Sequence, residues 1–215
     1  MILLLVLLLI SYLVGSIPSS IIMGQVTRGI DIRDYGSGNA GATNAFRVLG
    51  WKPALVVVVA DMFKGWLAAA LLAELTFGGL LGEIPFDNPT LAAILCGTAA
   101  VLGHTFTIFA GFKGGKGVGA LAGMLIHLFP VAVLLGLGVW LLVLMTTGYV
   151  GLGSVAAVSL FPLITYLRYG ALDSTLGYFS LVITLFIWFT HRGNIARLLA
   201  GTENRFEKAM ILRRR

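Results

Sequence analysis

The sequence is poor in charged residues and contains a single cysteine. Only 11% of its 215 residues are Asp, Glu, Lys or Arg, against about 25% in an ordinary soluble domain. A soluble fold of this size would lack the polar residues to cover its surface. The composition therefore excludes a soluble globular enzyme, a disordered chain and, despite the net charge of +6, a nucleic-acid binder. The lone Cys96 excludes an internal disulfide framework and a cysteine-based metal cluster.

Apolar residues and glycine are abundant instead. Hydrophobic residues make up 58% of the chain, and there are 28 glycines. Long apolar runs predict an all-α, polytopic integral membrane protein, and the glycines would let its helices pack backbone against backbone.

The apolar runs predict about seven transmembrane helices in one domain over residues 1–215. The first run has no basic start and exceeds the apolar part of a signal peptide, so a span is favoured there. A charge-free stretch over 118–167 is too long for two ordinary spans and is punctuated by Pro130 and Gly148. We therefore predict a short helix followed by two spans in this stretch. The predicted helices cover residues 1–24, 53–75, 90–110, 117–128, 129–147, 150–167 and 175–190.

The positive charges predict the orientation of the chain. Residues 25–52 contain four Lys or Arg, residues 111–117 two and residues 191–215 seven, which is 13 of the 15 in the sequence. With seven spans, all three segments lie on one side, which should be the cytoplasm. The N-terminus then lies outside, and a loop over 76–89 faces outward.

The first polar segment, residues 36–44, reads GSGNAGATN, and Arg47 follows one helical turn later. It contains G-x-G-x-x-G, but the chain offers no βαβ unit to make that a dinucleotide site. Glycine amides, a helix start and a guanidinium still favour an anion. The alternative is a membrane-surface turn capped by Ser37 or Asn39.

The second polar segment places Lys113 and Lys116 among glycines at residues 111–117. This pattern favours an anion-binding loop, although a positive-inside signal also needs lysines. His104 lies on a helix face shortly before the loop, as either a packed or a functional histidine.

The third polar segment, residues 191–203, puts His191, Asn194 and Arg197 on one helix face. The alternative is a stop-transfer run followed by a helix lying on the membrane surface, which leaves Asn194 unexplained.

Two charged residues, Asp61 and Lys64, lie within an apolar run. Such residues suggest function by default. The alternative is a buried ion pair that holds helices in register.

These segments resemble a known family when they are taken in order. Residues 37–44 with Arg47, D61-M-F-K-G65, G103-H-T-F with F112-K-G-G-K-G117, and the segment from His191 to Glu203 are similar to the bacterial acyl-phosphate:glycerol-3-phosphate acyltransferases (PlsY-like). The chain departs from the family pattern at Thr107, where proline is expected, and at Gly119.

The resemblance implies transfer of a fatty acyl group from acyl phosphate to the sn-1 hydroxyl of glycerol 3-phosphate. The products are lysophosphatidic acid and phosphate, in the first step of bacterial phospholipid synthesis. The H-x-x-x-x-D signature of thioester-dependent acyltransferases is absent. Because the donor is already activated, we expect direct transfer without an acyl-enzyme, and no metal or cofactor. Expected partners are acyl phosphate, glycerol 3-phosphate, the lipid bilayer of the inner membrane and the peripheral enzyme that makes acyl phosphate.

The expected active site lies at the cytoplasmic face. His191, Asn194 and Ser37 are the predicted catalytic residues, with His191 and Asn194 orienting the attacking hydroxyl. The predicted substrate-binding residues are Ser37, Gly38, Asn39, Thr43, Asn44, Arg47, Lys64, His104, Lys113, Gly114, Gly115, Lys116, Ser154, Arg192 and Arg197.

Two other functions compete with the acyltransferase as explanations of this sequence. A transporter of an organic phosphate needs a midplane site, whereas nearly all polar candidates lie on one face. A structural membrane subunit leaves the polar glycine segments unexplained.

Overall fold

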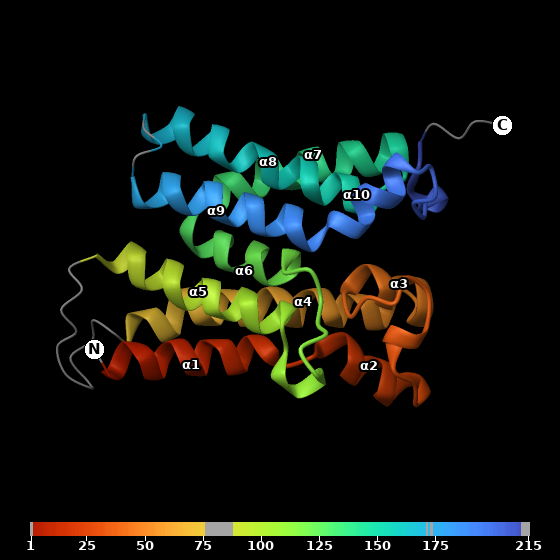
Figure 1. The fold of residues 1–215 in the computed structure, drawn as a ribbon, viewed down its shortest axis with the longest axis horizontal. Helices are drawn as coiled ribbons and strands as arrows, with labels where there is room; N and C mark the ends of the chain where they lie inside the picture. Colours follow the sequence, from red (N-terminus) through yellow and green to blue (C-terminus); the bar gives the residue numbers. More distant parts are fainter. Residues whose placement is uncertain (1, 76–87, 171, 173, 212–215) are drawn as a thin grey trace. The chain divides into compact units, whose positions relative to one another are not determined.

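The computed structural model describes residues 2–75, 88–170, 172 and 174–211, and every regular element in that part is helical (Figure 1). The predicted all-α fold is confirmed. The chain divides into two compact units, residues 1–128 and 129–215, which are described separately. A single membrane domain over 1–215 stays a prediction.

Each predicted apolar run is helical in the structure. The predicted short helix is α6 (Val118–Leu128), and the next three are α7 (Pro130–Thr147), α8 (Val150–Tyr169) and α9 (Thr175–Thr190). α6 and α9 are apolar but shorter than the segments that are long enough to cross a membrane. Those five segments are Ile2–Arg28, Trp51–Leu72, Pro89–Ala110, Pro130–Thr147 and Val150–Arg168. The number seven therefore stays a prediction for the spans, and most of the predicted loop, residues 76–87, lies outside the described residues.

The first span is broken, where a single helix was predicted. α1 (Ile2–Ser16) ends before Pro18, and α2 (Ser19–Arg28) begins after it. Proline lacks an N–H and interrupts the helical hydrogen bonds, so carbonyl oxygens at the break need other donors. The Thr107 hydroxyl donates to the Ser16 carbonyl, and Lys64 Nζ donates to the Ile17 carbonyl at 3.0 Å.

The remaining elements of residues 1–128 pack around this broken helix. α1 packs along α5, α4 along α6, and α3 on α4. α4 runs into a π-helical segment, η2 (Ala68–Leu72), and the 3-10 turns are η1 (Ile32–Asp34) and η3 (Ile108–Ala110). The other helices here are α3 (Ala42–Leu49), α4 (Trp51–Leu67) and α5 (Pro89–Thr105).

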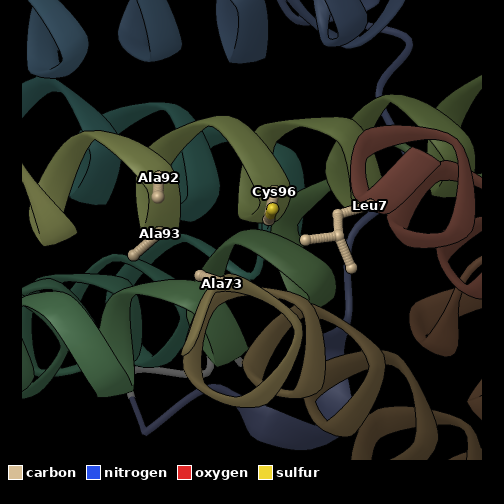
Figure 2. Close-up of a cluster of buried hydrophobic side chains, with 5 residues drawn as sticks. All are labelled: Leu7, Ala73, Ala92, Ala93 and Cys96. Carbon is tan, nitrogen blue, oxygen red and sulfur yellow. The ribbon is translucent and has the colours of Figure 1, made fainter. Parts of the chain in front are cut away.

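The cysteine lies in an apolar cluster of this unit. Figure 2 shows the Leu7 side chain extending toward Cys96, with Ala92 and Ala93 on the same helix as Cys96, α5, and Ala73 on another. Cys96 is fully buried, so its thiol packs against apolar side chains. The cluster consists of Leu7, Ala73, Ala92, Ala93 and Cys96.

Glycines bring helix backbones into contact, as predicted. A Cβ added at Gly65 or Gly123 would lie 1.9 or 1.7 Å from a carbonyl oxygen of the facing helix at the α4–α6 crossing. Gly15 and Gly103 perform the same role between α1 and α5. Only glycine allows such an approach, which replaces hydrophobic burial as the packing force inside a membrane.

Replacing Gly123 with alanine should therefore destabilise the protein by about 1–3 kcal/mol, because overpacking forces the two helices apart. Thermal unfolding in detergent measures the loss. Gly138, whose added Cβ would meet nothing within 4 Å, provides the matched control on α7. Equal melting temperatures for Gly123→Ala and Gly138→Ala would contradict the tight crossing.

Residues 129–215 form a second helical unit. α7 packs on α8, α8 on α9, and the short α10 (Arg192–Leu199) on α8 and α9. The rings of Phe129, Phe161 and Phe179 meet edge to face, with centroids 5.4 and 5.9 Å apart. A 3-10 turn, η4 (Glu207–Ala209), lies near the chain's end.

A proline also interrupts α8, and a side chain from α9 compensates. Pro162 cannot donate to the carbonyl of Val158 four residues earlier. The Thr184 hydroxyl of α9 donates to that carbonyl at 3.1 Å. The interruption therefore ties the two helices together.

Candidate active site

The segment over residues 36–44 is built around a buried asparagine. Asn44, which is 1% exposed, donates from Nδ2 to the carbonyls of Ile32 at 2.9 Å and Tyr35 at 3.0 Å. Its Oδ1 accepts the Ser37 N–H at 2.8 Å. Gly36 lies so close to Asn44 that an added Cβ would be 2.3 Å from Oδ1. The Asn44 side chain therefore shapes the segment, and its predicted contact with substrate stays a prediction.

The candidates around Asn44 are more accessible. Ser37 and Gly38 are exposed, and Asn39 and Thr43 are half-buried. The Gly38 N–H donates to the Tyr35 carbonyl at 3.1 Å, so it is used within the turn. Asn39 lies over the start of α3, since a Cβ added at Gly41 would be 2.9 Å from its Oδ1.

The α3 helix begins at this segment and carries Arg47. Its N-cap residue, Gly41, makes no side-chain cap hydrogen bond, so the first N–H groups of α3 face outward from the helix start. Thr43 and Arg47 lie four residues apart, which places them on one side of α3. Both side chains are half-buried.

A pair of residues that was not among the predicted site residues connects the glycine segments. The Asp31 carboxylate binds Arg33 Nη2 at 2.6 Å, and the hydrogen bonds from Arg33 hold the pKa of that carboxyl below its usual range. Arg33 Nη1 also donates to the carbonyls of Ala110 at 2.8 Å and Lys113 at 3.3 Å. This guanidinium therefore fixes the lysine loop to the η1 turn.

The lysine loop, residues 111–117, follows α5 and η3. The N–H groups of Gly114 and Gly115 donate to the carbonyls of Thr105 and His104, both at 3.0 Å. Both amides, which were predicted to hold a phosphate, are thus engaged within the chain, and their part in substrate binding stays a prediction. Exposed Lys113 and half-buried Lys116 are the loop's candidate anion ligands.

Lys64 and His104 converge on Asp61. Lys64 Nζ lies 2.9 Å and His104 Nδ1 lies 3.4 Å from Asp61 Oδ1, and all three residues are buried. Lys64 also donates to Ile17, as described above, which leaves its ammonium inside the helical bundle. Both residues were predicted to bind substrate, and the structure gives them contacts with the protein.

The third segment forms a second polar cluster, at the junction of α9 and α10. His191 is 3% exposed, and its Nδ1 lies 2.9 Å from the Ile187 carbonyl. A carbonyl oxygen only accepts, so Nδ1 carries a proton, and when the ring is neutral its acceptor is Nε2. This tautomer suits a group that receives a hydrogen bond from an alcohol.

Asn194 and Arg197 both donate hydrogen bonds to Glu203, which was not among the predicted site residues. Glu203 accepts from Asn194 Nδ2 and from Arg197 Nε, both at 2.7 Å. Its side chain is 5% exposed. A cavity of about 20 Å³ beside this cluster is lined by Gly151, Leu152, Val155, Asn194, Ile195, Leu198 and Glu203.

The other two candidates in this unit bond locally. The Ser154 hydroxyl donates to the Val150 carbonyl at 3.2 Å, and Ser154 is buried. Arg192 lies over the Phe189 ring at 4.2 Å and donates to its carbonyl at 2.8 Å. Arg192 is exposed.

Comparisons with known proteins agree on one family. The model of the family "Glycerol-3-phosphate acyltransferase" matches residues 5–201. Glycerol-3-phosphate acyltransferase of Chlorobaculum tepidum is 45% identical, covering 94% of this chain and 95% of that protein. The protein of the same name from Chlorobium phaeobacteroides strain BS1 is also 45% identical, covering 94% and 96%.

Two solved structures have the same fold. Both are crystal structures of PlsY, an integral membrane glycerol 3-phosphate acyltransferase, in its lysophosphatidic acid form and its glycerol 3-phosphate form. Each is 35% identical, with TM-scores of 0.80 and 0.79 and coverage of 94% of this chain and 94% or 95% of the other. From family, relatives and fold together, we conclude that this chain is an integral membrane protein of the glycerol-3-phosphate acyltransferase family.

Proposed function

We propose that this chain transfers a fatty acyl group from acyl phosphate to the sn-1 hydroxyl of glycerol 3-phosphate. The hydroxyl oxygen attacks the acyl carbon, the bond from that carbon to the phosphate oxygen breaks, and the hydroxyl proton passes to the departing phosphate, so that lysophosphatidic acid and hydrogen phosphate result. The family match over residues 5–201 is the observation that carries this proposal. It is supported by the order of the polar segments, which offer basic side chains for two phosphates.

Residues 1–128 contain the groups to which we assign the binding of phosphate. Ser37, Asn39, Thr43 and Arg47 lie around the start of α3 and have the donors to hold one phosphate. Lys113 and Lys116 supply charge for the other. We assign His191, through its Nε2 acceptor, and Asn194 to orienting the attacking hydroxyl. Because the acyl donor is an activated anhydride, orienting the substrates and stabilising charge are sufficient for catalysis.

The acyl chain needs an apolar surface, and α4 and α6 offer one. A groove of about 270 Å³ runs along them. It begins one turn after the glycine-rich start of α6, close in sequence to Lys116. We assign this groove to the acyl chain of the donor. Its lining residues are Val59, Met62, Phe63, Trp66, Gly123 and Ile126.

The setting of the reaction follows from the charge distribution. We propose that the protein lies in the bacterial inner membrane, with its three basic segments and C-terminus in the cytoplasm and its N-terminus outside. That face is where a peripheral enzyme making acyl phosphate could deliver its product.

Purified protein in nanodiscs should release phosphate and form lysophosphatidic acid when given acyl phosphate and glycerol 3-phosphate. Acyl-CoA is the control donor, and it should give no product. Mass analysis of the intact protein after incubation with acyl phosphate alone should show no acyl adduct, because we expect direct transfer. Product from acyl-CoA but not from acyl phosphate would overturn the proposed donor, and an adduct would overturn direct transfer.

A further inference from the structure

A buried carboxylate lies beneath the lysine loop. Asp61 is 3% exposed and sits within a segment that is apolar and long enough to cross a membrane. An ionised group at such a place is costly unless it is paired, and it marks a functional element by default. Lys64 neutralises it at 2.9 Å, and His104 approaches the same oxygen through Nδ1 at 3.4 Å.

The other edge of the His104 ring meets the loop. A Cβ added at Gly115 would lie 2.1 Å from His104 Nε2. Gly115 also donates its N–H to the His104 carbonyl. The imidazole therefore stands between Asp61 on one side and Gly115 on the other, and it is 6% exposed.

The contact extends to the first polar segment. The same added Cβ at Gly115 would be 3.0 Å from the carbonyl oxygen of Ala40. The lysine loop is thus packed between His104 and the segment that carries Ser37 and Asn39. A shift of the imidazole would therefore move both the lysine loop and the segment that carries Ser37 and Asn39.

A role in joining helices explains only part of this arrangement. The bond from Lys64 to Ile17 stabilises the break between α1 and α2, and Gly119 of α6 packs so closely that an added Cβ would be 2.9 Å from Asp61 Cβ. Neither contact requires a histidine between Asp61 and the loop. The contact of His104 Nδ1 with Asp61 Oδ1 at 3.4 Å favours the ring orientation that turns Nε2 toward Gly115.

We propose that Asp61 is a positioning residue for the lysine loop. Acting through the His104 ring, it fixes the place of Gly115 and with it the place at which Lys113 and Lys116 present their charges. The consequence for catalysis rests on the proposed function, whereas the consequence for the loop does not.

Hydrogen exchange tests the loop directly, without reference to activity. Either single substitution would leave its partner as a buried unpaired charge, so Asp61→Asn/Lys64→Met, which removes both charges together, is compared with the unaltered protein. The double variant should speed exchange of the Gly114 and Gly115 amides at least about tenfold, because these amides are protected by local structure that the ring supports. Amides in the middle of α4 and α5 should be unchanged, and His104→Ala should reproduce the effect at the loop.

Kinetics test the consequence for substrate. Lys113→Ala should raise the KM of one phosphate substrate, and Asp61→Asn/Lys64→Met should raise the KM of that same substrate at least about tenfold over the unaltered protein, with kcat within about threefold. Adding Lys113→Ala to the Asp61 variant should raise it little further, because both changes remove the same contact. Gly138→Ala is the control for an indifferent substitution.

The outcomes separate the two proposals. Unchanged exchange at Gly114 and Gly115, or equally faster exchange throughout α4 and α5, would overturn the positioning role. So would a rise in KM for the substrate that Lys113→Ala does not affect. Failure of the unaltered protein to use acyl phosphate would instead overturn the proposed function, while the exchange result would still decide the role of Asp61.

Discussion

Replacing Asn44 with alanine should lower kcat/KM by at least about 100-fold, which corresponds to about 2.7 kcal/mol. The side chain makes three hydrogen bonds, two to carbonyls and one to the Ser37 N–H. A buried polar group left without its partner costs about 1–3 kcal/mol. The segment would then populate its binding-competent conformation only rarely, and apparent affinity falls by that fraction.

The same assay on Asn204→Ala provides the control, because Asn204 is an exposed asparagine. Asn44→Asp adds a sharper comparison. A carboxylate can still accept from Ser37 but cannot donate to Ile32 or Tyr35, so most of the loss should remain. Kinetics within about threefold of the unaltered protein for Asn44→Ala would show that the segment keeps its shape without this side chain.

Replacing Glu203 with alanine should lower kcat by at least about 100-fold, a loss of about 2.7 kcal/mol. Its buried carboxylate receives hydrogen bonds from both Asn194 and Arg197. The Arg197 side chain is 43% exposed, so water can take the place of the carboxylate there, whereas the loss of this acceptor at buried Asn194 costs about 1–3 kcal/mol. Asn194, the group we assign to the attacking hydroxyl, then loses its fixed orientation.

Three further variants test whether the loss of kcat is specific to Glu203. Glu207→Ala removes an exposed carboxylate of the same unit and should have little effect. Glu203→Gln retains one acceptor and should lose less activity than alanine. The loss in Glu203→Ala/Arg197→Ala should be smaller than the sum of the two single losses, since they share one interaction. Full activity of Glu203→Ala would exclude this support for Asn194.

The long helices were predictable from the sequence because most of each helix lies in one apolar run. The predicted 129–147 and 175–190 match α7 and α9 to within about one residue, well inside the usual scatter of helix ends. The break at Pro18 was missed because apolar residues continue on both sides of it. A proline within an apolar run can end a helix or only kink it. Here the helix ends, and the side chains of residues 64 and 107 donate to the carbonyls at the break.

Candidate site residues could be predicted from the sequence, but their contacts could not. Glycines and lysines at 111–117 indicate an anion site, but the same glycines could also pack a loop onto a helix. Only the structure shows that the Gly114 and Gly115 amides bind carbonyls of α5. Likewise, Asp61 and His104 are far apart in sequence, and a single sequence contains no signal that brings them together.

The break between α1 and α2 also bears on how the protein is made. The ribosome delivers residues 1–28 first, whereas Lys64 and Thr107, the side-chain donors to the carbonyls of Ile17 and Ser16, are synthesised later. The Ile17 carbonyl also accepts the Ser19 N–H at 3.0 Å, so it has a partner before Lys64 is made. An unsatisfied carbonyl in hydrocarbon costs several kcal/mol. The broken helix of α1 and α2 therefore gains its final set of hydrogen bonds only once the segment after α5 has been made, although it is the first part of the chain to leave the ribosome.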